Sequence, residues 1–357
     1  MQVISERVQK MIQEGLAYPL AQSSKEEKDF IKLCSNENPF GPSPMAIEAI
    51  KSEAEKVGEY PESSSIELKE AIGEYLDINP VHISVGNGSD EVMDMVCKAT
   101  MNPGDKALIP IPSFSQYELI CRINAMDPNF VYLEDYQWNI ESLLEKTRDC
   151  RAIFIGRPNN PTGNSIDDED LEMLLETEKL VIVDEAYGEF SDYTVVDWIE
   201  GYENLIVLRT FSKMFGLAGL RVGYGISSKE IIEAMERVRS PFNVNRIAQK
   251  AAIAALKDKE FVGKARETIL NERNYLQREL ESLGFKTLPS DANFIMTSPK
   301  PLGMNATDVC NYLNREGILI RNLSGFRGIE SDWVRITVGR PKQNKRLIKT
   351  LEELIEG

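Results

Sequence analysis

The chain has 357 residues, of which 42% are hydrophobic and 27% charged, a composition typical of a folded globular protein. Its net charge of −16 argues against nucleic-acid binding, because a protein that binds phosphate backbones needs a positive surface. No stretch approaches the roughly 18 consecutive apolar residues of a membrane-spanning helix, and the five cysteines show no pairing pattern, which fits a reducing compartment. We therefore expect a cytoplasmic protein of about two domains that binds neither nucleic acid nor membrane.

The first part of the chain alternates short apolar runs with amphipathic stretches. The runs are rich in Val, Ile and Leu and end near Gly, Pro or Asp, which is typical of strands buried on both faces of a parallel sheet. Alternating strands and helices predict an α/β sheet with helices on both faces. The expected strands are 82–85, 106–109, 152–155, 180–183 and 205–208, and the expected helices between them include 90–100, 117–124 and 168–176.

The character of the sequence changes after residue 246. Residues 247–283 predict one or two long helices, and they precede three strand-like segments and a last helix at 343–355. This order predicts a second, smaller α+β domain. The expected strands are 293–297, 318–321 and 333–338, and the expected division is an N-terminal segment 1–34 that packs on the small domain, a large domain 35–245 and a small domain 246–357.

Ligands of an open α/β sheet bind at the carboxyl ends of its strands, so the residues there carry the functional information. The strand 82–85 is followed by Gly86-Asn87-Gly88-Ser89-Asp90-Glu91 and a helix. Small residues and a helix N-terminus suit a phosphate, although the same segment also fits an ordinary capped turn. It lacks the third glycine of the dinucleotide fingerprint, which argues against a nicotinamide enzyme.

Three further strand ends carry reactive groups. The segment 156–163 contains two prolines and a glycine that hold Asn160 in a rigid loop, and the next strand ends at Asp184. The strand 205–208 is followed by Arg209-Thr210-Phe211-Ser212-Lys213, with Arg221 eight residues further on. Taken singly, Asp184 also fits a helix cap and Lys213 an ordinary surface lysine.

Considered together, these groups match one coenzyme, pyridoxal 5′-phosphate. Its aldehyde requires an amine, its pyridine nitrogen a carboxylate, its ring oxygen donors, and its phosphate a helix end, hydroxyls and a guanidinium. No metal site is expected, since the single histidine, His82, excludes a multi-histidine cluster and is expected to be structural. Arg157 is expected to form a surface salt bridge.

Six motifs in chain order give the sequence a family resemblance. It resembles the fold-type-I aminotransferases and, within them, the histidinol-phosphate branch, from about residue 18 to the last helix. The resemblance implies a large domain with a mainly parallel sheet flanked by helices and a smaller α+β domain. The motifs are Asn36-Glu37-Asn38-Pro39-Phe40, Gly86 to Glu91, Pro158 to Gly163, Asp184-Glu185-Ala186-Tyr187, Arg209 to Arg221, and Val334 to Gly339.

The resemblance also implies roles for single residues. Lys213 would hold the coenzyme as an internal aldimine and move the proton, Asp184 would pair with the pyridine nitrogen, and Tyr187 would hydrogen-bond the ring oxygen with Asn160. Phe114 would stack on the ring, where many relatives have tyrosine, and Tyr60 would cross the interface of a homodimer. The expected phosphate-binding residues are Gly88, Ser89, Asp90, Thr210, Ser212 and Arg221.

The substrate residues are likewise implied by the resemblance. Arg335 would hold the anionic end of the substrate, with Arg321 as a second cation, and Tyr18 and Asn38 would complete the site. The implied reaction is ping-pong transamination from L-histidinol phosphate to 2-oxoglutarate, giving imidazole-acetol phosphate and L-glutamate. An aromatic or broad-range aminotransferase and a threonine-phosphate decarboxylase are alternatives on the same fold. A non-catalytic regulator would need a basic DNA-binding domain before the motifs.

Overall fold

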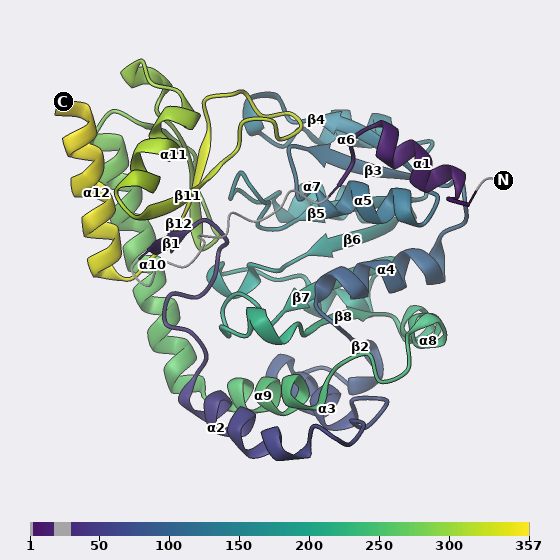
Figure 1. Ribbon diagram of the computed structural model, residues 1–357. Coiled ribbons are helices and arrows are strands. Elements are labelled where there is room, and N and C mark those ends of the chain that lie inside the picture. Colours follow the sequence, from purple (N-terminus) through teal and green to yellow (C-terminus); the bar gives the residue numbers. More distant parts are fainter. Residues whose placement is uncertain (1–2, 18–29, 357) are drawn as a thin grey trace.

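The computed structural model describes residues 3–17 and 30–356 and contains two sheets (Figure 1). The larger sheet has seven strands in the order β2-β8-β7-β6-β5-β3-β4. Strand β8 is antiparallel to both of its neighbours, and the other pairs are parallel, so the expected mainly parallel sheet is confirmed. The strands are β2 (Ile83–Gly86), β3 (Lys106–Ile111), β4 (Asp127–Tyr132), β5 (Ala152–Gly156), β6 (Leu180–Asp184), β7 (Leu205–Thr210) and β8 (Gly223–Ser227).

Helices cover both faces of the large sheet, which explains its apolar strands. Neighbouring strand residues point to opposite faces, and Ile153 and Phe154 accordingly belong to two different hydrophobic clusters. One face packs against α4 (Ser89–Thr100), α5 (Gln116–Ile123) and α8 (Lys229–Val238). The other packs against α3 (Ile66–Leu76), α6 (Ile140–Thr147) and α7 (Asp168–Leu175).

The smaller sheet has the strand order β1-β11-β12-β10-β9 and is antiparallel except for the pair of β1 with β11. It lies to the left of the large sheet in Figure 1, together with α10, α11 and α12. The strands are β1 (Ile31–Leu33), β9 (Lys286–Thr287), β10 (Phe294–Ser298), β11 (Ile318–Asn322) and β12 (Val334–Thr337), and the helices are α10 (Lys259–Ser282), α11 (Ala306–Arg315) and α12 (Pro341–Glu356).

Along the chain, α9 (Arg246–Lys257) and α10 lie between the large sheet and strands β9 to β12 of the small sheet. The predicted helical region 247–283 is interrupted at Asp258 into α9 and α10. Helix α9 packs against α2 (Pro44–Glu53) and α3, so contacts of the large-sheet layer continue past residue 245. Helix α1 (Glu6–Gln13) packs against α5 beside the large sheet, while the segment 31–33 joins the small sheet. None of the described helices is long and apolar enough to cross a membrane.

A buried ion cluster joins β7 to the segment after β6. Arg209 donates to Glu185 at 2.7 Å and to Glu189 at 3.0 Å, and all three side chains are buried. Thr194 Oγ1 accepts a further hydrogen bond from Arg209 at 2.8 Å. Each of the three buried charges therefore has an oppositely charged partner within hydrogen-bond distance, which offsets part of the cost of burying it.

Candidate active site

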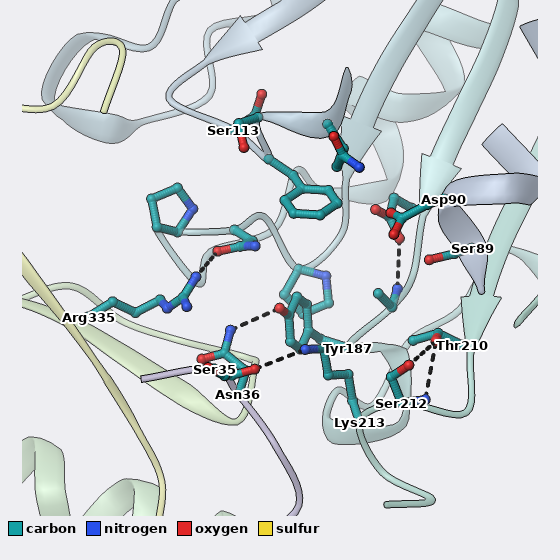
Figure 2. Close-up of a pocket in the computed structure, with 18 of the residues that line it drawn as sticks. Ser35, Asn36, Ser89, Asp90, Ser113, Tyr187, Thr210, Ser212, Lys213 and Arg335 are labelled. Carbon is teal, nitrogen blue, oxygen red and sulfur yellow. Dashed lines mark hydrogen bonds between the residues drawn. The ribbon is translucent and has the colours of Figure 1, made fainter. Parts of the chain in front are cut away.

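A cavity of about 460 Å³ opens at the carboxyl ends of the large-sheet strands, facing the small sheet (Figure 2). This volume lies within the range of roughly 300–1,000 Å³ that small-molecule sites occupy. Most of the residues predicted for the site line this cavity, and they come from chain segments of both sheets. They are Ser89, Asp90, Phe114, Asn160, Asp184, Tyr187, Thr210, Ser212, Lys213, Arg221, Arg321 and Arg335.

Asp184, the last residue of β6, is a buried carboxylate at the floor of the cavity. Its oxygens accept hydrogen bonds from Tyr117 Oη at 2.9 Å and from the Ala186 backbone N–H at 3.0 Å. Burial raises the pKa of Asp184 to about 6, although both hydrogen bonds act in the opposite direction. Among residues 3–17 and 30–356, no lysine or arginine forms an ion pair with it. The carboxylate is therefore set up for a cationic ligand group.

Lys213 lies in the loop after β7 and presents its amine to the same cavity. Nζ donates to the Ser35 carbonyl at 3.1 Å and lies 5.7 Å from the centre of the Tyr187 ring. Burial and, next, the nearby Arg335 lower the pKa of Lys213 to about 8. A free lysine titrates near pH 10.4, so this amine is a much better nucleophile at neutral pH.

The start of α4 and Arg221 form the end of the cavity suited to an anion. The first amides of a helix have no partner within it and attract anions. The Arg221 guanidinium lies beside them, 3.2 Å from Asp90, with Nη1 3.5 Å from Ser212 Oγ. Gly88 has φ 85°, and a Cβ there would lie 2.6 Å from Arg221 Nη2. A glycine is therefore needed for Arg221 to cross the start of the helix.

The side of the cavity next to the small sheet is lined by neutral and cationic donors. Arg335 donates to Asn160 Oδ1 at 2.5 Å and to the Cys34 carbonyl at 3.0 Å. Tyr187 Oη accepts from Asn36 Nδ2 at 2.9 Å. Arg335, Asn36 and Tyr187 are labelled around the cavity in Figure 2. The small sheet therefore supplies part of the site.

Comparison with known proteins identifies the family. Residues 28–351 match the model of the family described as aminotransferase class I and II. The chain belongs to the class I and II aminotransferases.

Relatives of this aminotransferase span nearly its whole length. It is 38% identical over 338 residues to histidinol-phosphate aminotransferase of Methanothermobacter thermautotrophicus, an alignment that covers 92% of this chain and 90% of that protein. The histidinol-phosphate aminotransferase structure from Clostridium acetobutylicum superposes with a TM-score of 0.85 at 29% identity, covering 91% and 99% of the two chains. That of Sinorhizobium meliloti, in complex with pyridoxal-5′-phosphate, has a TM-score of 0.87 at 24% identity, covers 100% of this chain and 98% of that chain, and shares the fold.

The aminotransferase depends on pyridoxal 5′-phosphate, and the cavity residues fit this coenzyme. A protonated pyridine nitrogen would supply the cation that buried Asp184 does not receive from the described residues. The amine of Lys213, with its lowered pKa, suits an aldehyde. Arg221, the helix start and the hydroxyls of Thr210 and Ser212 suit a phosphate.

Some predicted site residues lie elsewhere. Asn38, expected at the substrate, does not line the cavity, since its amide donates to the Met214 carbonyl at 2.6 Å and accepts from the Phe40 N–H at 2.9 Å. Tyr60 is 78% exposed and stacks on Phe242 outside the cavity, with ring centres 4.5 Å apart. Tyr18 lies outside the described residues.

Two residues predicted to be structural are also located. Arg157 forms the expected salt bridge, with the exposed Asp168, but its own side chain is buried and also donates to the Ile166 carbonyl at 3.0 Å, so the expected surface position was wrong. His82 Nδ1 lies 2.9 Å from the Ser227 carbonyl, and His82 comes just before β2, away from the carboxyl strand ends that form the cavity. Within the described ranges, no group of three or more His, Cys, Asp or Glu is arranged to hold a metal ion.

Sequence reasoning did not single out Tyr117 and Asn36, two cavity residues that hydrogen-bond predicted site residues. Burial raises the pKa of Tyr117 well above its usual value, so its hydroxyl remains the donor to Asp184. The available signal for Asn36 was the motif Asn36 to Phe40, from which Asn38 was chosen.

The lowered pKa of Lys213 predicts a stability effect in the coenzyme-free protein. The pKa of Lys213 is about 8 in the folded protein, against roughly 10.4 in the unfolded chain. The free energy of unfolding is therefore highest above about pH 10.4, and this stability is lost as the pH falls through 8. We expect Lys213→Met to raise the free energy of unfolding at pH 7 by about 3 kcal/mol at most. The gain should shrink towards pH 10, as measured by urea unfolding across this range.

The exposed Lys51, paired with Glu48 on the surface, provides the matched control. Lys51→Met should change the free energy of unfolding by less than about 1 kcal/mol at every pH. A Lys213→Met protein that is less stable than wild type at pH 7, or a difference that does not vary with pH, would contradict the buried-amine account.

Proposed function

We propose that this aminotransferase transfers the amino group of L-histidinol phosphate to 2-oxoglutarate, giving imidazole-acetol phosphate and L-glutamate, in histidine biosynthesis. The observation that carries the proposal is the pair of arginines, Arg321 and Arg335, on the small-sheet side of the cavity that holds Lys213. Guanidinium groups bind phosphate and carboxylate with the same planar set of donors. One anion site can thus serve a phosphate in one half-reaction and a glutamate carboxylate in the other.

Arg321 favours a phosphorylated substrate over an aromatic amino acid. Its guanidinium lies 5.2 Å from the centre of the Phe326 ring, and no acidic side chain in the described part of the chain pairs with it. A phosphate carries close to two negative charges at neutral pH and engages two guanidinium groups at once. An aromatic side chain would leave Arg321 without an anion.

The coenzyme, when bound, supplies an aldehyde that links covalently to amines and a ring that accepts electrons from the substrate Cα. Asp184 would keep the proton on the ring nitrogen, and Tyr117 and the Ala186 N–H hold its carboxylate in place. Lys213 would hold the coenzyme through its amine and, as a base, would carry the proton between the substrate Cα and C4′. Because donor and acceptor use the same cavity in turn, ping-pong kinetics follow.

The remaining residues orient the coenzyme. Asn160 and Tyr187 would donate to the ring oxygen, and Phe114 would stack on the ring. The backbone from Gly88 to Asp90 and the side chains of Thr210, Ser212 and Arg221 would hold the phosphate.

We further propose that the enzyme is a cytoplasmic homodimer in which Tyr60 reaches the coenzyme phosphate of the partner. Support comes from the exposed Tyr60, which with Val57 and Phe242 lines a hollow outside the chain's own cavity. The five free cysteines fit a reducing compartment.

The visible absorption of the purified protein tests the coenzyme and the amino donor together. We expect a pH-dependent band from the lysine-bound coenzyme that bleaches when L-histidinol phosphate is added. Lys213→Ala should lose the band and the turnover, whereas the surface control Lys51→Ala keeps both. Asp184→Ala should lower kcat by about 10²-fold or more.

Alternative donors decide the substrate in the same assay. Bleaching by phenylalanine or tyrosine in preference to histidinol phosphate would indicate an aromatic aminotransferase. Release of carbon dioxide from threonine phosphate without an oxo acid would indicate a decarboxylase, and either result would contradict the proposed donor.

The role of Arg321 gives a second prediction. Losing hydrogen bonds to a charged group costs about 1.5–3 kcal/mol, so Arg321→Ala should lower kcat/KM for histidinol phosphate roughly 10- to 100-fold. Arg321→Lys, which keeps the charge but not the planar donors, should fall between Ala and wild type. Equal losses for histidinol phosphate and for a non-phosphorylated amine donor would show that Arg321 does not recognise phosphate.

Mixed dimers test the position of Tyr60. Homodimers of Tyr60→Ala and of Lys213→Ala should both be impaired, but refolding the two together should restore activity in dimers with one intact site. Activity that stays at the level of the separate variants, or a monomer in sedimentation equilibrium, would contradict a shared site.

A further inference from the structure

Asn36 is fixed from several directions by the small sheet. It is 1% exposed, follows β1 and adopts the left-handed conformation with φ 56°. Its backbone N–H donates to Thr337 Oγ1 at 2.9 Å, and its carbonyl accepts from Asn293 Nδ2 at 3.1 Å. The position of Asn36 is therefore set by β12 and by the residue that precedes β10.

The hydrogen bonds around Asn36 fix the orientation of its side-chain amide. A backbone N–H can only donate, so Thr337 Oγ1 is an acceptor in the bond from the Asn36 N–H. Within the described residues, the acceptor for the hydroxyl proton of Thr337 is Asn36 Oδ1, at 2.9 Å. The carbonyl of the amide therefore faces Thr337, and its Nδ2 faces Tyr187 Oη at 2.9 Å.

This orientation determines what the Tyr187 hydroxyl can do. An amide nitrogen only donates, so the phenol oxygen accepts from Asn36 and its proton must point elsewhere. The charged groups that face Tyr187 are Lys213 from the loop after β7, Arg335 from β12 and Asp184 at the end of β6. No other hydrogen-bond partner of the hydroxyl occurs in the described part of the chain, which leaves the cavity as the direction of its proton.

We propose that Asn36 is a positioning residue that turns the hydroxyl proton of Tyr187 into the cavity, towards the ring oxygen of the coenzyme. The proposal rests on the proposed function, because the ring oxygen belongs to the coenzyme. A network that merely closed the loop after β1 would not need a donor facing Tyr187.

An acid at position 36 reverses the polarity of this hydrogen bond with little change in shape. A carboxylate only accepts, so in Asn36→Asp the Tyr187 hydroxyl donates to Asp and its proton leaves the cavity. The ring oxygen then loses a donor that stabilised its negative charge. The proton on the Lys213–coenzyme link is held more tightly, and the pH midpoint of the visible absorption change rises.

The experiment is a pH titration of the visible band of the coenzyme-loaded protein in a double-mutant cycle. We expect Asn36→Asp to raise the midpoint by about one pH unit. In the Tyr187→Phe background, which has no proton to redirect, the same substitution should raise it by about half of that or less. The added negative charge acts in both backgrounds, so the difference isolates the hydroxyl.

The control for the added charge is Asn79→Asp, at the exposed cap of the short helix Pro80–His82 at the opposite edge of the sheet. An acid caps a helix as well as asparagine does, so the fold should be kept. Because Asn79 lies before β2, away from the cavity at the carboxyl ends of the strands, the midpoint should not move. Equal shifts from Asn36→Asp in the two Tyr187 backgrounds would overturn the proposal.

A neutral pair of variants tests the same orientation if Asn36→Asp does not fold. Thr337→Val removes the hydroxyl proton that orients the amide and should raise the midpoint, whereas Thr337→Ser keeps the hydroxyl and should restore the wild-type value. A Thr337→Val titration identical to wild type would overturn the role of Asn36. A wild-type protein without any lysine-bound band would instead contradict the proposed function.

Discussion

The site is organised around a buried carboxylate, Asp184, with which no lysine or arginine of the described residues forms an ion pair. Asp184 and Glu185 are consecutive residues at the end of β6, yet their environments differ. Glu185 is joined to Arg209 by two hydrogen bonds, of 2.7 and 3.0 Å, whereas Asp184 receives hydrogen bonds from Tyr117 and a backbone amide but no cation from the described residues. Burying an unpaired charge is costly, and the raised pKa of Asp184 reflects that cost. The ion pair of Glu185 with Arg209 is structural, and Asp184, which has no such partner among the described residues, marks where the ligand binds.

The strands of the large sheet were predictable where they are continuous apolar runs. Two strands, β4 and β8, were not predicted, for different physical reasons. Strand β4 lies at the edge of the sheet and begins with Asp127-Pro128-Asn129, so partial exposure removes the apolar signal. Strand β8 contains glycines because α4 packs directly on it: a Cβ at Gly223 would lie 2.5 Å from Ser89 N, and one at Gly225 2.7 Å from Val92 Cγ1. Glycine normally argues against a strand, and here tertiary packing requires it.

The candidate site was predictable to the extent that it consists of strand ends. The carboxyl ends of parallel strands meet at one edge, which is why Asn160, Asp184 and Lys213 line a common cavity. Tyr117 reaches the cavity through the packing of α5. Asn36 reaches it through hydrogen bonds with Tyr187, which is 151 positions further along the chain, and with Thr337, which is 301 positions further. A local sequence pattern reveals neither. The choice between Asn36 and Asn38 depends on the left-handed backbone at Asn36, which the sequence does not specify.

The most direct test is the protonation state of the coenzyme nitrogen next to Asp184. With pyridoxal 5′-phosphate labelled with ¹⁵N in the ring, the ¹⁵N resonance of the loaded wild-type protein at neutral pH should lie at the position of a protonated pyridine. In Asp184→Asn, which keeps the shape of the side chain without its charge, the resonance should move to the unprotonated position. An unprotonated nitrogen in the wild type, or the same resonance in both proteins, would contradict the claim that the buried carboxylate is completed by the coenzyme.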